Sequence, residues 1–222
     1  MSLPPGGVPV DRAGERLVLL PQRAVWLPCH GCLLVADAHI GKAVAFRRLG
    51  VPVPEGTTDG TLDRLSAALA ATGAGCVIFL GDLLHSARGR ASATLASVQR
   101  WRERHAGLQL LLVRGNHDRH AGDPPAGWGV QAVDEPLRLG GLALMHHPQP
   151  VAGAYVLAGH LHPCAVLGGR AHDRLRLPCF HFGPAVGVLP AFGEFTGMHA
   201  LPRAAGDRVF VVQGAAVRPL PA

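Results

Sequence analysis

Short apolar runs bounded by glycine and proline constrain the fold of this chain more than any other feature of its sequence. Seven runs have the length and composition of β-strands: residues 24–27, 33–36, 76–80, 108–113, 142–145, 155–158 and 209–212. Apolar residues at helical spacing predict helices over 58–71 and 92–106, which end before Gly73 and Gly107. Strands and helices therefore alternate in the first half, while the second half is mostly strands. This order predicts an α/β (α+β) sandwich of sheets flanked by helices.

The length and composition fit a single domain over residues 1–222. With 48% apolar and 16% charged residues, a chain of 222 residues can bury roughly 70% of its unfolded surface. A disordered tail protein is therefore excluded. Segments 1–13 and 214–222 are rich in proline and glycine, and we expect them to be loosely held tails.

No segment of the sequence suggests a membrane or export. It contains no stretch of about 18 apolar residues, and its first residues form neither a basic nor an apolar signal region. We expect a cytoplasmic protein with no membrane association. The five cysteines are an odd number, which argues against a disulfide framework and favours buried thiols.

Polar clusters follow five of the predicted strands, each where the strand ends. They are residues 37–39 (DAH), 81–85 (GDLLH), 115–118 (GNHD), 146–147 (HH) and 159–162 (GHLH). Loops at the carboxyl ends of strands are where α/β proteins place their functional sites, because the strands hold the loops rigidly. Within these loops, we expect Gly115 and Gly159 to allow sharp turns with positive φ.

The side chains of these clusters are those of a divalent metal site. Seven of them could bind metal: Asp37, His39, Asp82, Asn116, His146, His160 and His162. Carboxylate, amide and imidazole together suit manganese, iron or zinc, and the lack of thiolates disfavours structural zinc. Seven donors are too many for one ion, and a carboxylate can bridge two, so the sequence predicts two divalent cations.

The five clusters, in this order, resemble the calcineurin-like metallophosphoesterase superfamily. The resemblance implies a four-layer αββα sandwich of two mixed sheets between helices. It also implies that Asp37, His39, Asp82 and His162 bind one ion, and that Asp82, Asn116, His146 and His160 bind the other. Asp82 would then bridge the ions. We prefer His146 to His147 as a ligand because it directly follows an apolar run.

The chemistry expected of such a centre is hydrolysis of a phosphodiester. Two cations clamp the phosphoryl group and activate a hydroxide that attacks in line with the leaving oxygen. His117, next to the ligand Asn116, is the natural proton donor to that oxygen, with His85 or Asp118 orienting its ring. The position of His85 also resembles that found in nucleases of the superfamily.

A narrower resemblance covers most of the chain. Residues 39–42 (HIGK), 47–50 (RRLG), 177–180 (LPCF) and 189–197 (LPAFGEFTG) are similar to the bacterial ligase-associated DNA-damage-response metallophosphoesterases. This similarity implies a DNA endonuclease that uses Mn²⁺, with Fe or Zn as alternatives. It also implies a functional association with an ATP-dependent DNA ligase and a helicase.

The charge of the chain is compatible with a nucleic-acid partner. Twenty-one basic against fifteen acidic residues give a net charge of +6, although biased genomic base composition would also enrich arginine. Lys42, Arg47 and Arg48 follow the first ligand loop and could contact phosphates beside the scissile one.

These observations favour a two-metal DNA endonuclease in DNA repair, acting on single-stranded or flexible DNA. A small-molecule phosphoesterase of the same fold is the alternative, with a phosphomonoester, cyclic nucleotide or nucleotide-sugar pyrophosphate as substrate. A non-catalytic scaffold is the third reading. The apparently complete ligand set argues against the scaffold, and the lack of a large insertion between the clusters favours an open site for a polymer.

Overall fold

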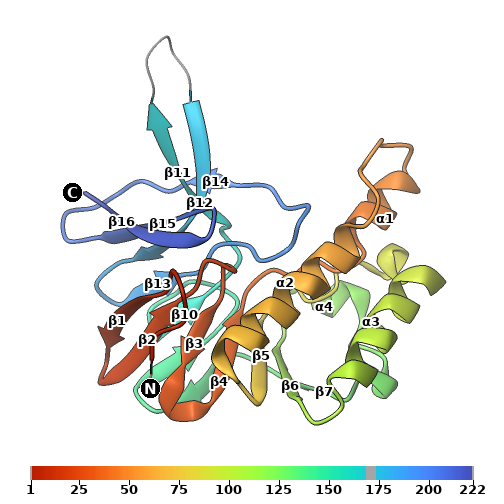
Figure 1. Cartoon of the computed structure of the whole chain (residues 1–222), viewed down its shortest axis with the longest axis horizontal. Helices are drawn as coiled ribbons and strands as arrows, with labels where there is room; N and C mark the ends of the chain where they lie inside the picture. Colours follow the sequence, from red (N-terminus) through yellow and green to blue (C-terminus); the bar gives the residue numbers. More distant parts are fainter. Residues whose placement is uncertain (1, 169–173, 222) are drawn as a thin grey trace.

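The computed structural model describes residues 2–168 and 174–221, which form two mixed β-sheets and a layer of helices (Figure 1). The first sheet contains seven strands in sequence order: β1 (Val8–Arg12), β2 (Glu15–Leu19), β3 (Val25–Leu27), β4 (Cys32–Val35), β5 (Cys76–Leu80), β6 (Gln109–Val113) and β7 (Val130–Val133). Strands β1 to β4 pair antiparallel, and β4 to β7 pair parallel. The carboxyl ends of β4, β5 and β6 therefore lie at one edge.

The α-helices of the described chain all fall between residues 42 and 121. They are α1 (Lys42–Arg47), α2 (Thr57–Thr72), α3 (Ser92–Arg104) and α4 (Asn116–Ala121). Leu65 of α2 and Trp101 of α3 share one buried cluster with Leu33 and Phe79, so these two helices cover one face of the first sheet. Within residues 2–168 and 174–221, no helix combines the length and the apolarity that crossing a bilayer requires.

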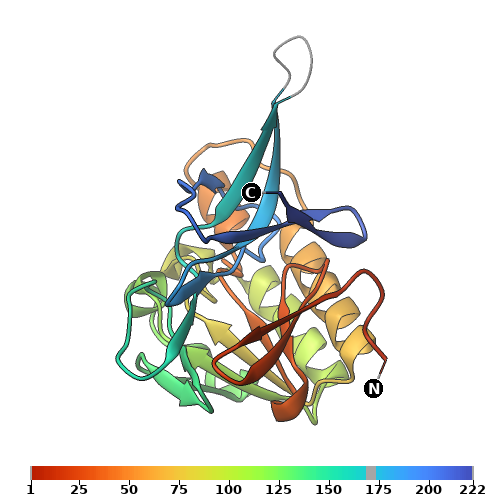
Figure 2. The same ribbon diagram turned by 90° about the vertical axis from the view of Figure 1, so that its left-hand side faces the viewer.

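The second sheet is formed by the second half of the chain. Its order is β14 (His199–Ala200), β11 (Pro163–Gly168), β12 (Arg174–Phe182), β13 (Val186–Val188), β10 (Tyr155–Ala158), β9 (Leu142–Leu144) and β8 (Leu137–Leu139), with β15 (Arg208–Gln213) on β12 and β16 (Ala216–Leu220) on β15. Strand β10 runs parallel to β9 and β13. Strands β11 and β12 form a long ribbon that projects from the body of the molecule (Figure 2).

The two sheets pack face to face over a large part of the core. Leu34 and Ile78 of the first sheet lie in one buried cluster with Leu144, Leu157 and Phe180 of the second. The expected α/β sandwich of two mixed sheets is thus confirmed. The helical layer, however, covers the first sheet only.

On the outer face of the second sheet, loop residues occupy the place of the fourth layer that the superfamily resemblance implied. Met145 and Val156 on that face pack against Val151 and Ala154 of the β9–β10 connection. No α-helix follows Ala121 within the described residues. The sequence has no helically spaced apolar stretch there, so this side has no helix to contribute.

The two segments expected to be loose tails each contain a paired strand, which corrects that expectation for residues 2–13 and 214–221. Strand β1 pairs with β2 over five residues, and β16 pairs with β15 over five. Val10 and Val217 are only 3% and 5% exposed, so each end is held by apolar burial that its proline and glycine content concealed. Met1 and Ala222 lie outside the described residues.

Candidate metal centre and active site

The five polar clusters converge at the carboxyl ends of β4, β5, β6, β9 and β10. Strands β4 to β6 are mutually parallel, as are β9 and β10, so each sheet brings its own loops to one edge. Backbone hydrogen bonds join the loops, since the amides of Asp37 and His39 donate to the carbonyl oxygens of Gly81 and Asp82. The site is therefore assembled from both sheets.

One group of donors combines Asp37, His39 and His162. The Nε2 atoms of His39 and His162 are 3.3 Å apart, and His162 Nε2 lies 3.5 Å from Asp37 Oδ1. Asp82 Oδ2 is 3.9 Å from His39 Nε2. These atoms surround a common point from three different loops, as metal ligands do.

A second group combines His146, Asn116 and His160 around the other oxygen of Asp82. His146 Nε2 lies 3.5 Å from Asp82 Oδ1, 2.8 Å from Asn116 Oδ1 and 3.0 Å from His160 Nδ1. Asp82 thus turns one carboxylate oxygen toward each group. The structure brings together all seven side chains that the sequence singled out as metal ligands.

The two adjacent histidines of the HH cluster have different environments. The His146 ring is fully buried, and its Nδ1 lies 3.1 Å from the carbonyl oxygen of Leu80, which it can donate to while Nε2 stays free as a ligand. His147 Nδ1 is 2.7 Å from Glu135 Oε1, although its ring also lies beside His146 and His160. Burial would raise the pKa of Glu135, but hydrogen bonds from His147 and His146 lower it.

The protonation of the site leaves its donors ready for cations. Burial, and then the charge of Asp37, raises the pKa of Asp82 to about 6. Burial, and then the charge of Lys42, holds the pKa of His39 far below its usual range, so that this imidazole is neutral. Asp37 Oδ1 is buried without a hydrogen-bond partner among the described residues. Crowded carboxylates beside neutral imidazoles are what divalent cations stabilise, so these residues fit the two metals.

The backbone of this centre is strained. Five candidate ligands have positive φ angles between 45° and 71°: Asp37, His39, Asp82, His160 and His162. Such angles are uncommon for residues other than glycine and cost about 1–3 kcal/mol each. They persist because the surrounding loops aim these side chains at one small volume.

Two glycines of the clusters serve close packing rather than a positive φ, which corrects our expectation for Gly115 and Gly159. Gly115 has a φ of −92°, and Gly159 is not among the positive-φ residues of the described chain. A Cβ atom at Gly115 would lie 2.3 Å from Asp82 Oδ1, and one at Gly159 would lie 2.6 Å from Asp37 Oδ2. Any side chain at either position would displace a candidate ligand.

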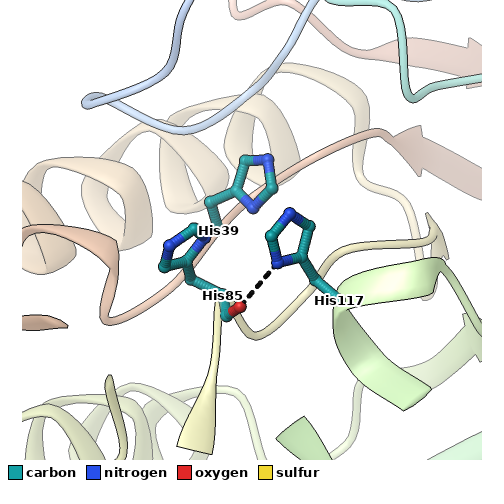
Figure 3. A group of neighbouring side chains, drawn as sticks. All are labelled: His39, His85 and His117. Carbon is teal, nitrogen blue, oxygen red and sulfur yellow. Dashed lines mark hydrogen bonds between the residues drawn. The ribbon is translucent and has the colours of Figure 1, made fainter. Parts of the chain in front are cut away.

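His117 lies beside the donor groups, with its Nε2 3.9 Å from Asp82 Oδ2. Its Nδ1 lies 2.8 Å from the backbone carbonyl oxygen of His85, and the two rings stack with centroids 4.7 Å apart (Figure 3). The His39 ring meets both edge-on, so three imidazoles from three loops face a shared space. Burial, and then the charge of His117, lowers the pKa of His85 to about 4.

We expected either His85 or Asp118 to orient the ring of His117, and Asp118 does not do so. Its Oδ1 accepts the backbone N–H of Leu84 at 3.1 Å, and its Oδ2 accepts that of Gly115 at 3.0 Å. Burial raises its pKa to about 6 against these two hydrogen bonds. The carboxylate ties the GDLLH loop to the GNHD loop, and the backbone of His85 orients the His117 ring.

The three basic residues after the first loop differ in their positions. Lys42 lies near the centre: burial lowers its pKa, while the charges of Asp37 and Asp82 oppose that shift. Arg47 donates to the carbonyl oxygens of Val53 and Pro54, and Arg48 to that of Arg88. Both arginines are exposed; Arg47 binds the segment that follows its own helix, Arg48 binds the segment after the GDLLH cluster, and both have guanidinium donors left over.

Sequence reasoning missed Glu135, which holds both residues of the HH cluster. The carboxylate accepts the backbone N–H groups of His146 and His147 at 2.8 and 3.1 Å. It lies eleven residues before His146, next to Pro136 and outside every cluster, so no motif pointed to it.

Comparison with solved structures shows one strong similarity. The crystal structure of Pseudomonas putida nuclease MPE is 47% identical, with a TM-score of 0.85, over 96% of this chain and 100% of that one. Escherichia coli Yfce, a phosphoesterase, is 15% identical over 82% of this chain and 88% of its own, with a TM-score of 0.38. Vps29 from Entamoeba histolytica, crystallised with zinc, is 15% identical over 85% and 96%, with a TM-score of 0.35. No protein-family profile and no curated protein matches the chain.

Proposed function

This chain belongs to the metallophosphoesterase family of the Pseudomonas putida nuclease MPE, and from that membership we propose that it is a two-metal DNA endonuclease of DNA repair. It is a metal-dependent phosphoesterase. The convergence of seven metal-binding side chains on Asp82, whose two oxygens face two donor groups, carries the proposal of two metals.

The ligand assignment follows the two groups. Asp37, His39, Asp82 and His162 would hold one cation, and Asp82, Asn116, His146 and His160 the other. Mn²⁺ suits this oxygen and nitrogen set, as do Fe and Zn. When bound, the cations supply the positive charge that stabilises the phosphodiester in the transition state and activates water for attack.

His117 is the general acid in this proposal. Hydrogen bonding to the His85 carbonyl oxygen fixes a proton on Nδ1, so Nε2 is the nitrogen that gives its proton to the leaving oxygen. After that transfer the ring is neutral and retains the Nδ1 hydrogen bond. His85 stacks on the ring and limits its rotation.

DNA, single-stranded or flexible, is the substrate that we propose. Lys42 follows the first ligand loop, and the charges of Asp37 and Asp82 act on it, so we assign it to a phosphate beside the scissile one. Arg47 and Arg48 are exposed on the same helix end and add positive charge along the path of a strand. A functional association with an ATP-dependent ligase and a helicase suits an enzyme that produces ends for repair.

Cleavage of circular single-stranded DNA tests this function. The purified protein, stripped with a chelator and reloaded with Mn²⁺, Fe²⁺, Zn²⁺ or Mg²⁺, is incubated with the circle, and products are resolved on a denaturing gel. We expect linear and then shorter fragments with Mn²⁺ and an intact circle with the chelator. An activated aryl phosphodiester is assayed in parallel. Its hydrolysis by an enzyme that leaves the circle intact would favour the small-molecule phosphoesterase.

A further inference from the structure

A basic cavity of about 500 Å³ opens beside the proposed metal centre. His162 belongs to both, because it faces Asp37 and also lines the cavity. The other walls come from segments far apart in the sequence, and the polar side chains among them are Arg23 of the β2–β3 turn, Arg64 of α2, Arg176 of β12, and Glu194 and Thr196 of the loop after β13.

Positive charge is in excess on these walls. Three guanidinium groups line the cavity, and Glu194 is the only acidic residue among its described lining residues. Arg64 is occupied, since it donates to the Glu194 carboxylate and to the Phe192 carbonyl oxygen and lies over the Phe192 ring. The negative charge of Glu194 therefore mainly offsets the positive charge of Arg64.

Arg23 and Arg176 have no such partners among the described residues, and Arg23 is the more buried of the two. The described residues make no hydrogen bond with its side chain, although it is partly buried. Burial, and then the charge of Arg64, lowers its pKa, while the charge of Glu194 opposes that shift. Its backbone has a φ of 62°, a conformation that costs energy for a residue other than glycine.

We propose that this cavity binds the phosphate next to the scissile one in a DNA strand, and that Arg23 is its principal contact. The inference rests on the proposed function and names a subsite of it. A phosphate at this position would supply the anion that Arg23 and Arg176 lack, and a guanidinium can bind it through two parallel hydrogen bonds. Because His162 lines both the cavity and the metal centre, the subsite would hold the phosphate of the neighbouring nucleotide in the DNA strand.

Dinucleotides with an added terminal phosphate test the subsite directly. A dinucleotide has one scissile phosphodiester, and a 5′- or 3′-terminal phosphate adds one flanking anion on a chosen side. We expect one of the two additions to raise kcat/KM by about tenfold in the parent enzyme, the gain typical of a charge-assisted hydrogen bond. Arg23→Gln should abolish that gain and hydrolyse the unphosphorylated dinucleotide at the parent rate.

Arg104→Gln is the matched control, because it removes the same charge from an exposed position on α3. It should retain the full gain. On a longer single strand, Arg23→Gln should also lower the slope of log Kd against log salt by about 0.7, the value for one phosphate contact. Thermal unfolding of both variants verifies that they fold.

The outcomes separate the subsite from the function. If neither terminal phosphate raises kcat/KM, or if Arg23→Gln and Arg104→Gln behave alike, the subsite is wrong while the endonuclease stands. If Arg23→Gln also slows hydrolysis of the aryl diester, which has no flanking phosphate, the substitution affects the reaction step itself and the proposed subsite is again overturned. A parent enzyme that cleaves the aryl diester and no nucleic acid would overturn the function, and the subsite with it.

Discussion

Single residues of the metal centre combine an unusual backbone with an unusual protonation state. Asp82 has a φ of 52° and a pKa raised to about 6, and His39 has a φ of 45° and a strongly lowered pKa. Each change follows from placing polar side chains in a small buried volume, where neutral forms are favoured until a cation arrives. The effect of a substitution here therefore depends on individual atoms, and three predictions follow from specific ones.

Asp82→Asn should reduce activity more than any other single ligand substitution. A bridging carboxylate offsets the charge of two cations, and an amide offsets neither. Substituting a residue that only orients a metal ligand typically lowers metal affinity or activity 10- to 100-fold. We therefore expect this substitution of a ligand itself to lower activity by more than about 100-fold. Metal content by mass spectrometry and hydrolysis of an aryl diester measure it. Two retained metals with a near-normal rate would refute the bridging role.

His117→Ala should leave metal content unchanged and slow DNA cleavage by about 10²- to 10⁴-fold, the range of a lost general acid. An aryl diester should lose much less, because its phenolate leaves without needing a proton. The test is the ratio of the two losses. Equal losses would assign His117 to binding of the phosphate in the ground state.

Gly159→Ala should weaken metal binding, because its Cβ would lie 2.6 Å from Asp37 Oδ2 and 2.9 Å from Ala36 Cβ. Overpacking of this kind costs about 1–3 kcal/mol of stability. Gly107→Ala is the control, since no atom lies within 4 Å of its added Cβ. Metal titration and thermal unfolding compare the variants, and equal metal affinity in both would show that the loop adapts.

Several elements with an unbroken apolar run or a helical apolar stripe could be predicted from the sequence, whereas β1, β12 and β16, whose buried residues are separated by charged residues or proline, could not. Strands β5 and β10 have the predicted bounds, and α2 extends one residue beyond its prediction at each end. Helix α4 (NHDRHA) has no apolar stripe, because its first residues serve the site. The ligand set was predictable because strand ends gather it, whereas Glu135 and Arg23 join their sites through tertiary packing alone.

Strand β16 gives the prediction at this scale. Deleting residues 216–222 should remove the burial of Val217 and expose the edge of β15, whose Val209 and Val211 are buried. We expect a loss of about 2 kcal/mol or more in the free energy of unfolding. Urea denaturation measures it, and an unchanged midpoint would restore the segment to a loose tail.

The metal centre depends on the packing of the whole molecule, because each sheet supplies part of its donors. Residues 37–116 of the ligand set follow strands of the first sheet, and residues 146–162 follow strands of the second. The apolar core between the sheets, which includes Leu80 and Leu157, therefore sets the separation of the two ligand groups. The pH dependence of stability is likewise a sum over both sheets.

We expect the metal-free protein to become more stable as the pH rises from about 4 to 6.5. Burial lowers the pKa of four site histidines: His39, His85, His146 and His160. The unfolded chain then binds more protons than the folded one between the folded pKa of His85, about 4, and the unfolded value of 6.5. Each such proton contributes about 1.4 kcal/mol per pH unit.

Two carboxyl groups act in the opposite sense. The pKa values of Asp82 and Asp118 are raised from 3.8 to about 6, so the folded chain binds more protons in that interval. The four histidines change the number of bound protons more than the two carboxyl groups do, so the free energy of unfolding still rises with pH. Thermal unfolding with excess chelator across this range tests the sum; a melting temperature that falls with increasing pH would contradict it.

The contact between His39 and His162 joins residues 123 positions apart in the chain, as does the hydrogen bond from the backbone of His160 to Asp37. Closing so long a loop is entropically costly and slow, so the centre forms only when most of the chain has already folded. During synthesis, a ribosome that has not yet released residue 162 holds a chain without a complete ligand set. We therefore expect chains that end before residue 162 to have no hydrolytic activity.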